Sequence, residues 1–304
     1  MKIISEKEFE KLNNTVLTIG KFDGLHKGHQ KLIAKMAELK EEGYVSVLFT
    51  FKKAPKEILS LEDVDYILTQ YEKEAFLENR GLDYYIEYPC DEEVLSTSAE
   101  DFINDIIVGK IGAKIIVCGT DFRFGKNREG DVYLLKALEE KYGYEVIVLD
   151  KLKYENVDIS SSRIRDAVKD GNIELVNKLL DYNYTVIGRV VTGNKIGRSL
   201  GFPTANITPE DKKLLPPCGV YYTKAQIDGC EYKGVTNVGR KPTVNEKNPV
   251  NIETCFLGYD GDLYGKTIEV QFYKFVRPEM KFESLDVLKG QIKKDVEGCL
   301  KFVY

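Results

Sequence analysis

The sequence contains no tryptophan and only two histidines in 304 residues, His26 and His29. Its six cysteines are scattered, without a Cys-x-x-Cys pair, at positions 90, 118, 218, 230, 255 and 299. With both histidines in one short segment, no zinc-ligand pattern can be assembled. Isolated cysteines of this kind are typical of reduced, structural thiols, so we expect a cytoplasmic protein.

Long apolar runs are also missing. None approaches the roughly 20 residues that a membrane-spanning helix needs, and the N-terminal MKIISEKEFEKL has no apolar signal core. The net charge of −5, from 44 basic and 49 acidic residues, argues against a nucleic-acid or anionic-membrane surface. We therefore expect neither of these partners. Nothing in the sequence implies an obligatory protein partner. The length and the hydrophobic content of 43% predict a globular chain of about two domains.

The first half alternates short apolar runs with helix signals. Apolar residues recur at helical spacing after His29 as far as a stop at Gly43, and Ser98 with Asp101 has capping-box spacing. The apolar runs are typical of parallel strands buried on both faces: 15–20, 45–51, 84–88, 114–118 and 145–149. This alternation predicts an open, doubly wound α/β domain of Rossmann-like type over residues 1–183.

Beyond residue 183 the strands follow one another with Gly, Pro and Asp turns and no long helix between them. The runs are 185–192, 219–226, 232–238, 251–259 and 268–276. They predict a small antiparallel β-barrel over residues 184–304, with a sandwich as the alternative. A terminal helix from Ser284 is expected to pack on this domain through one apolar face, formed by Leu285, Leu288, Ile292, Val296 and Leu300.

Both histidines lie in TIGKFDGLHKGHQKLI, residues 18–33, between the first strand and the first helix. This is the carboxyl edge of the sheet, where such folds bind ligands, and a helix N-terminus, which favours phosphate. The segment is neither the GxGxxG fingerprint nor a P-loop. Spaced three apart, both imidazoles could point at one phosphate, as hydrogen-bond donors or, if protonated, as cations. The alternative is that they are ordinary loop and helix residues.

This segment resembles the signature of HxGH nucleotidyltransferases in the form found in bacterial FAD synthetases. In the same order, GTDFRFGKNREGD (119–131) resembles their flavin and nucleotide loop, and ISSSRIRDAVKDGN (159–172) their Ser-Ser-Thr-x-Ile-Arg motif. GRSLGFPTANI (197–207), ETCFLGYDGDLYGK (253–266) and VRPEMKFESLDVLKGQIKKDV (276–296) resemble a riboflavin kinase module. The resemblance to this bifunctional family covers nearly the whole chain.

For the first module the resemblance implies transfer of AMP from ATP to FMN, which forms FAD and releases pyrophosphate. The FMN phosphate is already an anionic nucleophile, so catalysis needs positioning and cationic groups. His26 and His29 would be catalytic, Asp121, Phe122 and Phe124 would face the flavin, and ATP would be bound by Gly20, Phe22, Asp23, Gly28, Ser160, Ser161 and Arg165. From the residues alone, Asp23 could bind Mg²⁺ or cap the turn, Arg165 could be solvated, and the two phenylalanines could be core residues.

For the second module the resemblance implies phosphorylation of riboflavin to FMN by ATP with Mg²⁺. Glu253 would be the catalytic base for the ribityl hydroxyl, and Thr204 and Asn206 would hold the metal. Further ATP contacts would come from Gly188, Lys195, Gly201, Pro203 and Asn206, and a flavin contact from Arg277. The alternatives are a water-facing strand glutamate for Glu253 and a solvated loop lysine for Lys195.

The sequence departs from the family pattern at several positions and at the domain junction, where LLDYNYTVIG (179–188) lacks the usual Gly-Arg-Pro. Ala54, in TFKKAP (50–55), stands where a histidine is usual, Lys21 where asparagine is common, and Cys255 where a histidine follows the catalytic glutamate. The alternative function is therefore a monofunctional riboflavin kinase with an inactive adenylyltransferase domain. Two further alternatives are a flavin-binding regulator without catalysis and adenylyl transfer to another acceptor, such as pantetheine phosphate or nicotinamide mononucleotide.

Overall fold

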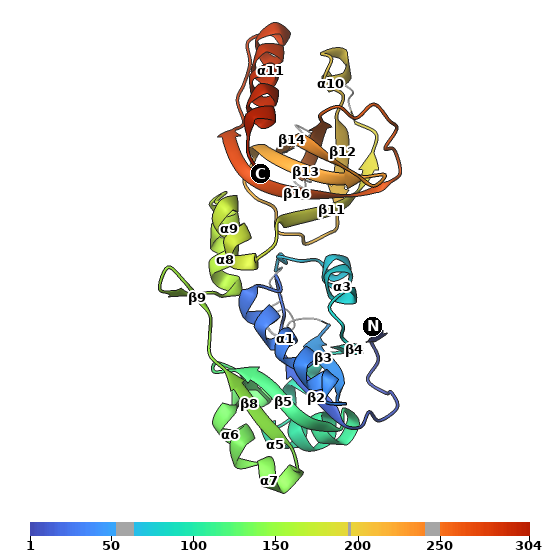
Figure 1. Cartoon of the computed structure of the whole chain (residues 1–304), viewed down its shortest axis with the longest axis vertical. Helices are drawn as coiled ribbons and strands as arrows, with labels where there is room; N and C mark the ends of the chain where they lie inside the picture. The colour runs from blue at the N-terminus through green and yellow to red at the C-terminus, as the bar shows by residue number, and fades with distance from the viewer. Residues whose placement is uncertain (53–63, 194–195, 241–249) are drawn as a thin grey trace. The chain divides into compact units, whose positions relative to one another are not determined.

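The computed structural model describes residues 1–52, 64–193, 196–240 and 250–304. The predicted site residue Lys195 and the departure at Ala54 lie outside the described residues. Backbone contacts divide the chain into two compact units (Figure 1). One comprises Met1–Val64 and Gln70–Ser160, and the other comprises Asp65–Thr69 and Ser161–Tyr304.

A parallel sheet of six strands forms the centre of the first unit. Its order is β1 (Lys2–Ile4), β4 (Tyr84–Tyr88), β3 (Val45–Phe51), β2 (Thr15–Ile19), β5 (Ala113–Gly119) and β8 (Glu145–Leu149). All five residues of β2 are buried, as expected for a strand covered on both faces. The prediction of an open, doubly wound sheet is confirmed. Of the strands in this sheet, the prediction missed only β1, because a strand of three residues is too short to show a periodic pattern.

Helices and short hairpins complete the first unit: α1 (Lys27–Glu41), α3 (Gln70–Glu78), α4 (Glu92–Ser96), α5 (Ala99–Asp101), the π-helical η1 (Phe102–Lys110), β6 (Arg123–Phe124), η2 (Lys126–Arg128), β7 (Gly130–Asp131), α6 (Val132–Ala137), α7 (Glu139–Tyr142), β9 (Lys153–Tyr154) and β10 (Val157–Asp158). The predicted helix signals are confirmed. The Ser98 hydroxyl accepts a hydrogen bond from the Asp101 N–H at 3.1 Å. Gly43 follows α1 with φ +96°, a left-handed conformation that favours glycine.

The second unit is a closed antiparallel barrel, so the sandwich alternative is wrong. Its order is β11 (Tyr184–Val191), β12 (Ala205–Pro209), β15 (Val250–Phe256), β14 (Cys230–Arg240), β13 (Gly219–Ile227) and β16 (Thr267–Pro278). Strand β12 was not predicted, because Gly, Pro and Asn surround it and made the segment resemble a loop. Threonine hydroxyls fill part of the interior: Thr236 shares hydrogen bonds of 2.8 Å with Thr223 and with Thr254.

Four helices of the described residues belong to this unit: α8 (Ser161–Lys169), α9 (Ile173–Leu180), α10 (Ile196–Ser199) and α11 (Leu285–Lys301). Helix α9 buries one apolar face, and its Asn177 side chain donates to the Phe272 carbonyl and accepts from the Tyr184 N–H. By packing, α8 and α9 therefore go with the barrel. The predicted functional boundary at 183/184 stays a prediction.

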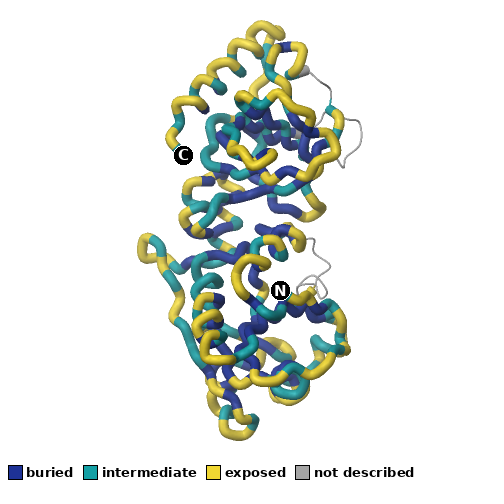
Figure 2. The backbone as a smooth tube through the Cα atoms, turned by 45° about the vertical axis from the view of Figure 1, so that its right-hand side comes forward, coloured by how far each residue is buried: buried dark blue, intermediate teal, exposed yellow. Residues whose placement is uncertain are grey.

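The predicted apolar face of α11 is wrong at both ends of the helix. Leu285 is 62% exposed and Leu300 is 58% exposed, while Leu288, Ile292 and Val296 are half-buried. The buried residues of this helix are Asp295 and Cys299. Most of α11 is drawn in yellow and teal, that is, exposed or intermediate, in Figure 2. Arg277 of β16 binds the Asp295 carboxylate with an N–O distance of 2.7 Å, so an ion pair replaces part of the expected apolar contact. No helix among the described residues is long and apolar enough to cross a membrane.

Candidate active sites

The two histidines lie together where the turn after β2 enters α1. His26 is the N-cap of α1, and its Nδ1 accepts a hydrogen bond from the His29 backbone N–H at 3.4 Å. The imidazole rings are stacked, with centroids 3.7 Å apart, and Phe22 packs edge-on against His29. Buried Phe22 and Leu25 have φ of +47° and +39°, a strained path that side chains rarely adopt. The turn thus holds both imidazoles side by side.

Gly28, between the two histidines, leaves room for the His26 ring. A Cβ atom at this position would lie 3.1 Å from His26 Cε1. Gly20 likewise leaves room for the Phe22 ring, which would lie 3.3 Å from a Cβ atom at position 20. These two glycines therefore permit the packing of the turn, and their predicted contact with ATP stays a prediction.

Burial makes both imidazoles neutral at physiological pH. It lowers the pKa of His26 to about 4, and it lowers the pKa of His29 well below the usual value, with His26 and Lys73 adding to the effect. His29 Nδ1 is buried and makes no hydrogen bond with the described residues. The arrangement therefore favours the imidazoles as neutral hydrogen-bonding groups rather than as cations.

Sequence reasoning missed a buried lysine close to the histidines. Lys73, on α3, is 7% exposed and interacts electrostatically with His29, Asp23 and Glu87. Asp23 and Glu87 are each only 4% exposed, and no carboxylate among the described residues lies within 4 Å of the Lys73 ammonium. Burial lowers the pKa of Lys73, and the two carboxylates oppose that effect. The local sequence TQYEKEAFLENR shows only an ordinary amphipathic helix.

The packing of α3 on α1 explains how Lys73 reaches this place. Phe76 of α3 and Arg80 just beyond it line one small cavity of about 150 Å³ with Gln30 and Ile33 of α1. Lys73 is three residues before Phe76, so it lies on the same face of α3, which is the face toward α1.

The loop after β5 contributes one exposed and two packed residues. Asp121 forms an ion pair with Lys151 at 2.9 Å, and its charge acts on His26. Phe122 and Phe124 stack on each other, and Phe124 is 7% exposed within the core. The core alternative for Phe124 is thus favoured by its burial, while the predicted flavin contacts stay predictions.

The Ser-Ser-Ser-x-Ile-Arg motif straddles the division between the units. Ser160 ends the first unit, whereas Ser161 and Arg165 lie in α8 of the second. Both serines and Arg165 are half-buried. Their predicted contacts with ATP stay predictions.

On the barrel, Glu253 lies between two asparagines. In the strand register it pairs with Asn206 of β12 and with Asn237 of β14, so the three side chains share one face. Its neighbour Thr254 is fully buried inside the barrel. Because successive side chains of a strand point to opposite faces, the row of Asn206, Glu253 and Asn237 lies on the outer face of the barrel. Sequence reasoning missed Asn251, which donates to Glu253 Oε1 at 2.7 Å and to Asn206 Oδ1 at 3.0 Å. Only the register of the strands brings it there.

The loop before β12 approaches these residues closely. A Cβ at Gly193 would lie 2.2 Å from Asn206 Nδ2, and a Cβ at Gly197 would lie 3.2 Å from Thr204 Oγ1. Asn206 is 5% exposed and Thr204 half-buried. The amide and the hydroxyl are hard oxygen donors of the kind that Mg²⁺ accepts, so these residues fit that metal.

The other predicted residues of this module have visible structural roles. Gly188 allows β11 and β12 to approach, since a Cβ there would lie 2.3 Å from the Thr208 carbonyl oxygen. Gly201, at φ +88°, and Pro203 are exposed in the loop. Arg277 is engaged by Asp295 and by the Pro278 carbonyl. Cys255 is buried, which raises the pKa of its thiol to about 11. The predicted nucleotide and flavin contacts of these residues stay predictions.

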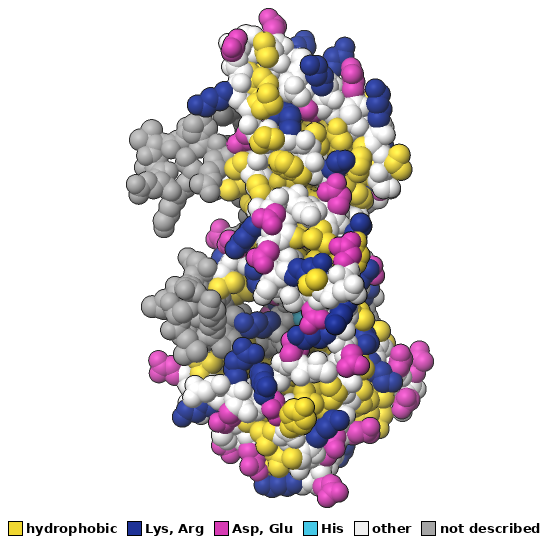
Figure 3. Space-filling model, turned by 90° about the vertical axis from the view of Figure 1, so that its left-hand side faces the viewer, with side chains coloured by type: hydrophobic (Ala, Val, Ile, Leu, Met, Phe, Trp, Pro, Cys, Tyr) yellow, Lys and Arg dark blue, Asp and Glu magenta, His cyan; other side chains and the backbone are white. Residues whose placement is uncertain are grey.

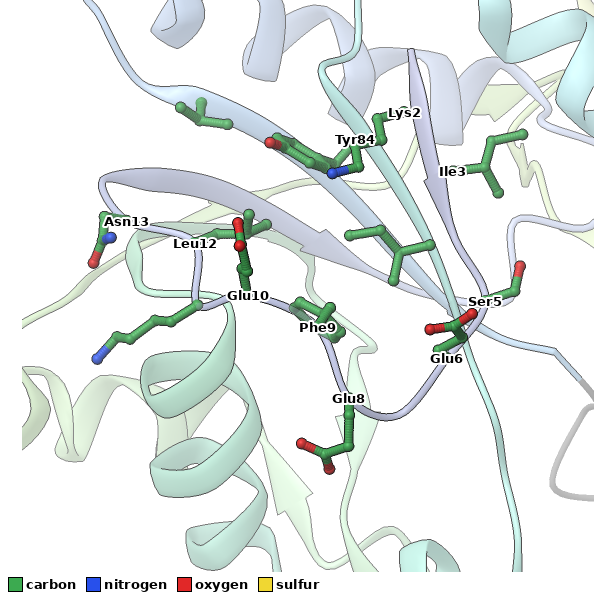
Figure 4. A pocket seen from close by; sticks show the side chains of 13 residues that line it. Lys2, Ile3, Ser5, Glu6, Glu8, Phe9, Glu10, Leu12, Asn13 and Tyr84 are labelled. Carbon is green, nitrogen blue, oxygen red and sulfur yellow. The ribbon is translucent and has the colours of Figure 1, made fainter.

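Another pocket lies elsewhere in the first unit. Its volume is about 510 Å³, and residues 2–6 and 8–13 line it with Val45 and Tyr84 (Figure 4). Lys2, Val45 and Tyr84 begin their strands, so this pocket lies at the amino ends of the sheet, away from the histidine turn. Ligands of doubly wound folds bind at the carboxyl ends. Elsewhere, on the face that Figure 3 shows, basic and acidic side chains are interspersed.

Comparison with known proteins decides the family. A model described as FAD synthetase matches residues 8–163, and one described as riboflavin kinase matches residues 180–303. A bifunctional riboflavin kinase/FMN adenylyltransferase from Buchnera aphidicola is 37% identical over 299 residues, which cover 96% of each chain. The chain belongs to the bifunctional riboflavin kinase/FMN adenylyltransferase family. A member of this family from Bacillus subtilis is 35% identical, with 96% of this chain and 94% of that one covered.

A solved structure agrees with this family assignment in fold. A crystal structure named as a macrolide-efflux protein from Streptococcus pneumoniae matches with a TM-score of 0.89 and 31% identity over 99% of each chain. The name of that protein refers to transport. The family assignment of this chain rests instead on its two modules and on the similarity over its whole length to bifunctional riboflavin kinase/FMN adenylyltransferases.

Proposed function

We propose that this chain is a bifunctional enzyme that makes FMN and then FAD. Its barrel module phosphorylates riboflavin with ATP, and its α/β module transfers AMP from ATP to FMN with release of pyrophosphate. The observation that carries the proposal is the presence of both modules, each with its own reactive cluster: two stacked imidazoles at a helix N-terminus, and a carboxylate among amides on a barrel. The six cysteines are all free thiols, which supports the expected cytoplasmic location.

The kinase step needs a base and a bound phosphate. A bond forms between the terminal ribityl oxygen and the γ-phosphorus of ATP, ADP leaves, and the hydroxyl proton passes to Glu253. Thr204 and Asn206 would hold Mg²⁺, which neutralises phosphate charge when bound. The carboxylate suits the role of base because its half-buried position on the barrel surface leaves part of it accessible.

The adenylyl transfer needs cationic groups rather than a base. An FMN phosphate oxygen bonds to the α-phosphorus of ATP, and pyrophosphate leaves. His26 and His29, being neutral, donate hydrogen bonds to the ATP phosphates, and the adjacent ammonium of Lys73 supplies positive charge for the transition state. Asp23 remains open to either of its predicted roles, and Arg165 and Ser161 are further proposed phosphate ligands.

Two variants test whether each reaction has its own site. We expect Glu253→Gln to abolish FMN formation but leave conversion of supplied FMN to FAD largely intact, because the amide cannot accept the proton. His29→Ala should lower FAD formation by about 100-fold or more and leave FMN formation intact. Chromatographic separation of flavins after incubation with riboflavin or FMN, ATP and Mg²⁺ measures both.

The same assay separates the alternatives. FMN that accumulates in the wild-type reaction without any FAD would favour a monofunctional kinase with an inactive first module. Tight flavin binding without ATP consumption would favour a regulator. Loss of both reactions in either folded variant would contradict the assignment of separate sites.

A further inference from the structure

We propose that Asn251 is a positioning residue of the kinase reaction, which fixes the Glu253 carboxylate and the Asn206 amide relative to each other. The proposal rests on the proposed role of Glu253. It goes beyond that role because it assigns a function to a side chain outside every motif in the sequence. One amide group makes both connections.

The hydrogen bonds define how the amide is oriented. The Asn251 side-chain NH₂ group donates to Glu253 Oε1 at 2.7 Å and to Asn206 Oδ1 at 3.0 Å. A carboxylate can only accept, so the side-chain nitrogen of Asn251 must face it. Both protons of the nitrogen are then used, one on each partner. Among the polar side chains of similar size, only asparagine supplies two donors without a charge.

These two hydrogen bonds, the Asn251 bridge, act on Asn206, the side chain that would hold the metal. Asn206 is packed against the Cα of Gly193 on one side and bound by Asn251 on another, so its amide has little freedom. Its Oδ1 keeps a second lone pair for a ligand. The relative position of Asn206 and Glu253 decides how far the base is from the phosphate, and misplacement of about 1 Å can cost about 100-fold in rate.

The neighbours of Glu253 on the sheet show why the side chain at position 251 must be uncharged. Glu253 is flanked across the sheet by the uncharged Asn206 and Asn237, and Asn237 in turn donates to Glu279 at 3.4 Å. A second carboxylate at residue 251 would face Glu253 at hydrogen-bonding distance and would repel it. The structure therefore points to two informative variants, Asn251→Asp, which keeps the shape, and Asn251→Ala, which removes the bridge.

The test is steady-state kinetics of both reactions on the full-length protein. We expect Asn251→Asp to lower kcat for riboflavin phosphorylation by about 100-fold, and Asn251→Ala by about 10-fold or more, with KM for riboflavin changed less than about threefold. FMN adenylylation should stay at the wild-type rate. Gln226→Glu, which adds the same charge at an exposed position of β13, is the matched control and should leave both reactions unchanged.

The outcomes are distinct. A wild-type kcat for riboflavin phosphorylation in Asn251→Asp would overturn the proposal, and so would a loss that appears only in KM. A merely structural role predicts instead a lower unfolding temperature for Asn251→Ala and little effect of the isosteric Asn251→Asp. If Glu253→Gln kept full kinase activity, the proposed function of Glu253 would fail first, independently of Asn251.

Discussion

Burial of Lys73 in the first unit carries an electrostatic cost. An ammonium that is 7% exposed loses most of its hydration, and the nearby Asp23 and Glu87 carboxylates offset that loss only partly. Buried charges that are not directly paired occur preferentially at functional sites. We expect Lys73→Met, which keeps the volume, to lower the rate of FMN adenylylation by about 100-fold and to leave riboflavin phosphorylation unchanged.

Two comparisons make this result specific. Lys73→Arg keeps the charge and should retain more activity than Lys73→Met. Lys153→Met removes a charge from the exposed β9 and should be neutral. Equal activity of Lys73→Met and wild type, measured by FAD formation from FMN at saturating ATP, would show that the ammonium takes no part.

Residues of this kind could not be predicted from the sequence. His26, His29 and Glu253 lie in motifs whose order along the chain is itself a signal. Lys73 and Asn251 acquire meaning only through tertiary structure, because helix packing buries one and strand register aligns the other. A lysine in an amphipathic segment and an asparagine at the start of a strand are both ordinary in isolation.

At the scale of the elements, the start of α1 couples stability to pH. His26 caps this helix through its neutral Nδ1, and burial lowers its pKa to about 4. Between its ordinary pKa of about 6.5 and this value the unfolded chain binds the proton more tightly than the folded one. The folded state is therefore favoured fully above about pH 6.5 and loses stability as the pH falls toward 4. From pH 7 to 5 this residue alone should cost about 2 kcal/mol.

The variant His26→Asn isolates this contribution. Asparagine is a good N-cap that does not titrate, so the helix keeps its cap while the proton linkage disappears. Urea unfolding at pH 7 and pH 5 should show a smaller decrease in the free energy of unfolding for the variant than for the wild type. The same decrease in both proteins would assign the pH dependence to other groups.

The elements themselves were predictable where their pattern was long. The five predicted strands of the first sheet and the capped helices have apolar runs or cap residues that act locally, although β8 is only partly buried. Strands β1 and β12 were missed, because three residues show no period and because Gly, Pro and Asn around Ala205–Pro209 indicate a loop. The ends of the predicted apolar face on α11 were wrong, and the contact of this helix with β16 includes an ion pair between Arg277 and Asp295.

At the scale of the whole molecule, functional modules and compact units do not coincide. The family models end and begin at residues 163 and 180, and the segment between them contains α9, which packs on the barrel. The segment Asp65–Thr69 also joins the barrel unit, where the Leu214 N–H donates to the Tyr66 carbonyl and Lys213 Nζ to the Ile67 carbonyl. A boundary derived from motifs cannot detect such packing, because the motifs contain residues of the active sites and not those that pack in the core.

A core substitution in α9 tests which module this helix supports. Leu179 is fully buried, and Leu179→Ala should cost about 2–5 kcal/mol. If α9 is part of the core of the barrel, the temperature of half-inactivation of riboflavin phosphorylation should fall by roughly 10 °C. Leu300→Ala, at a 58% exposed position of α11, should have almost no effect. An unchanged temperature for the kinase together with a lower one for adenylyl transfer would instead assign α9 to the first module, because cavity formation destabilises the core in which the side chain is packed.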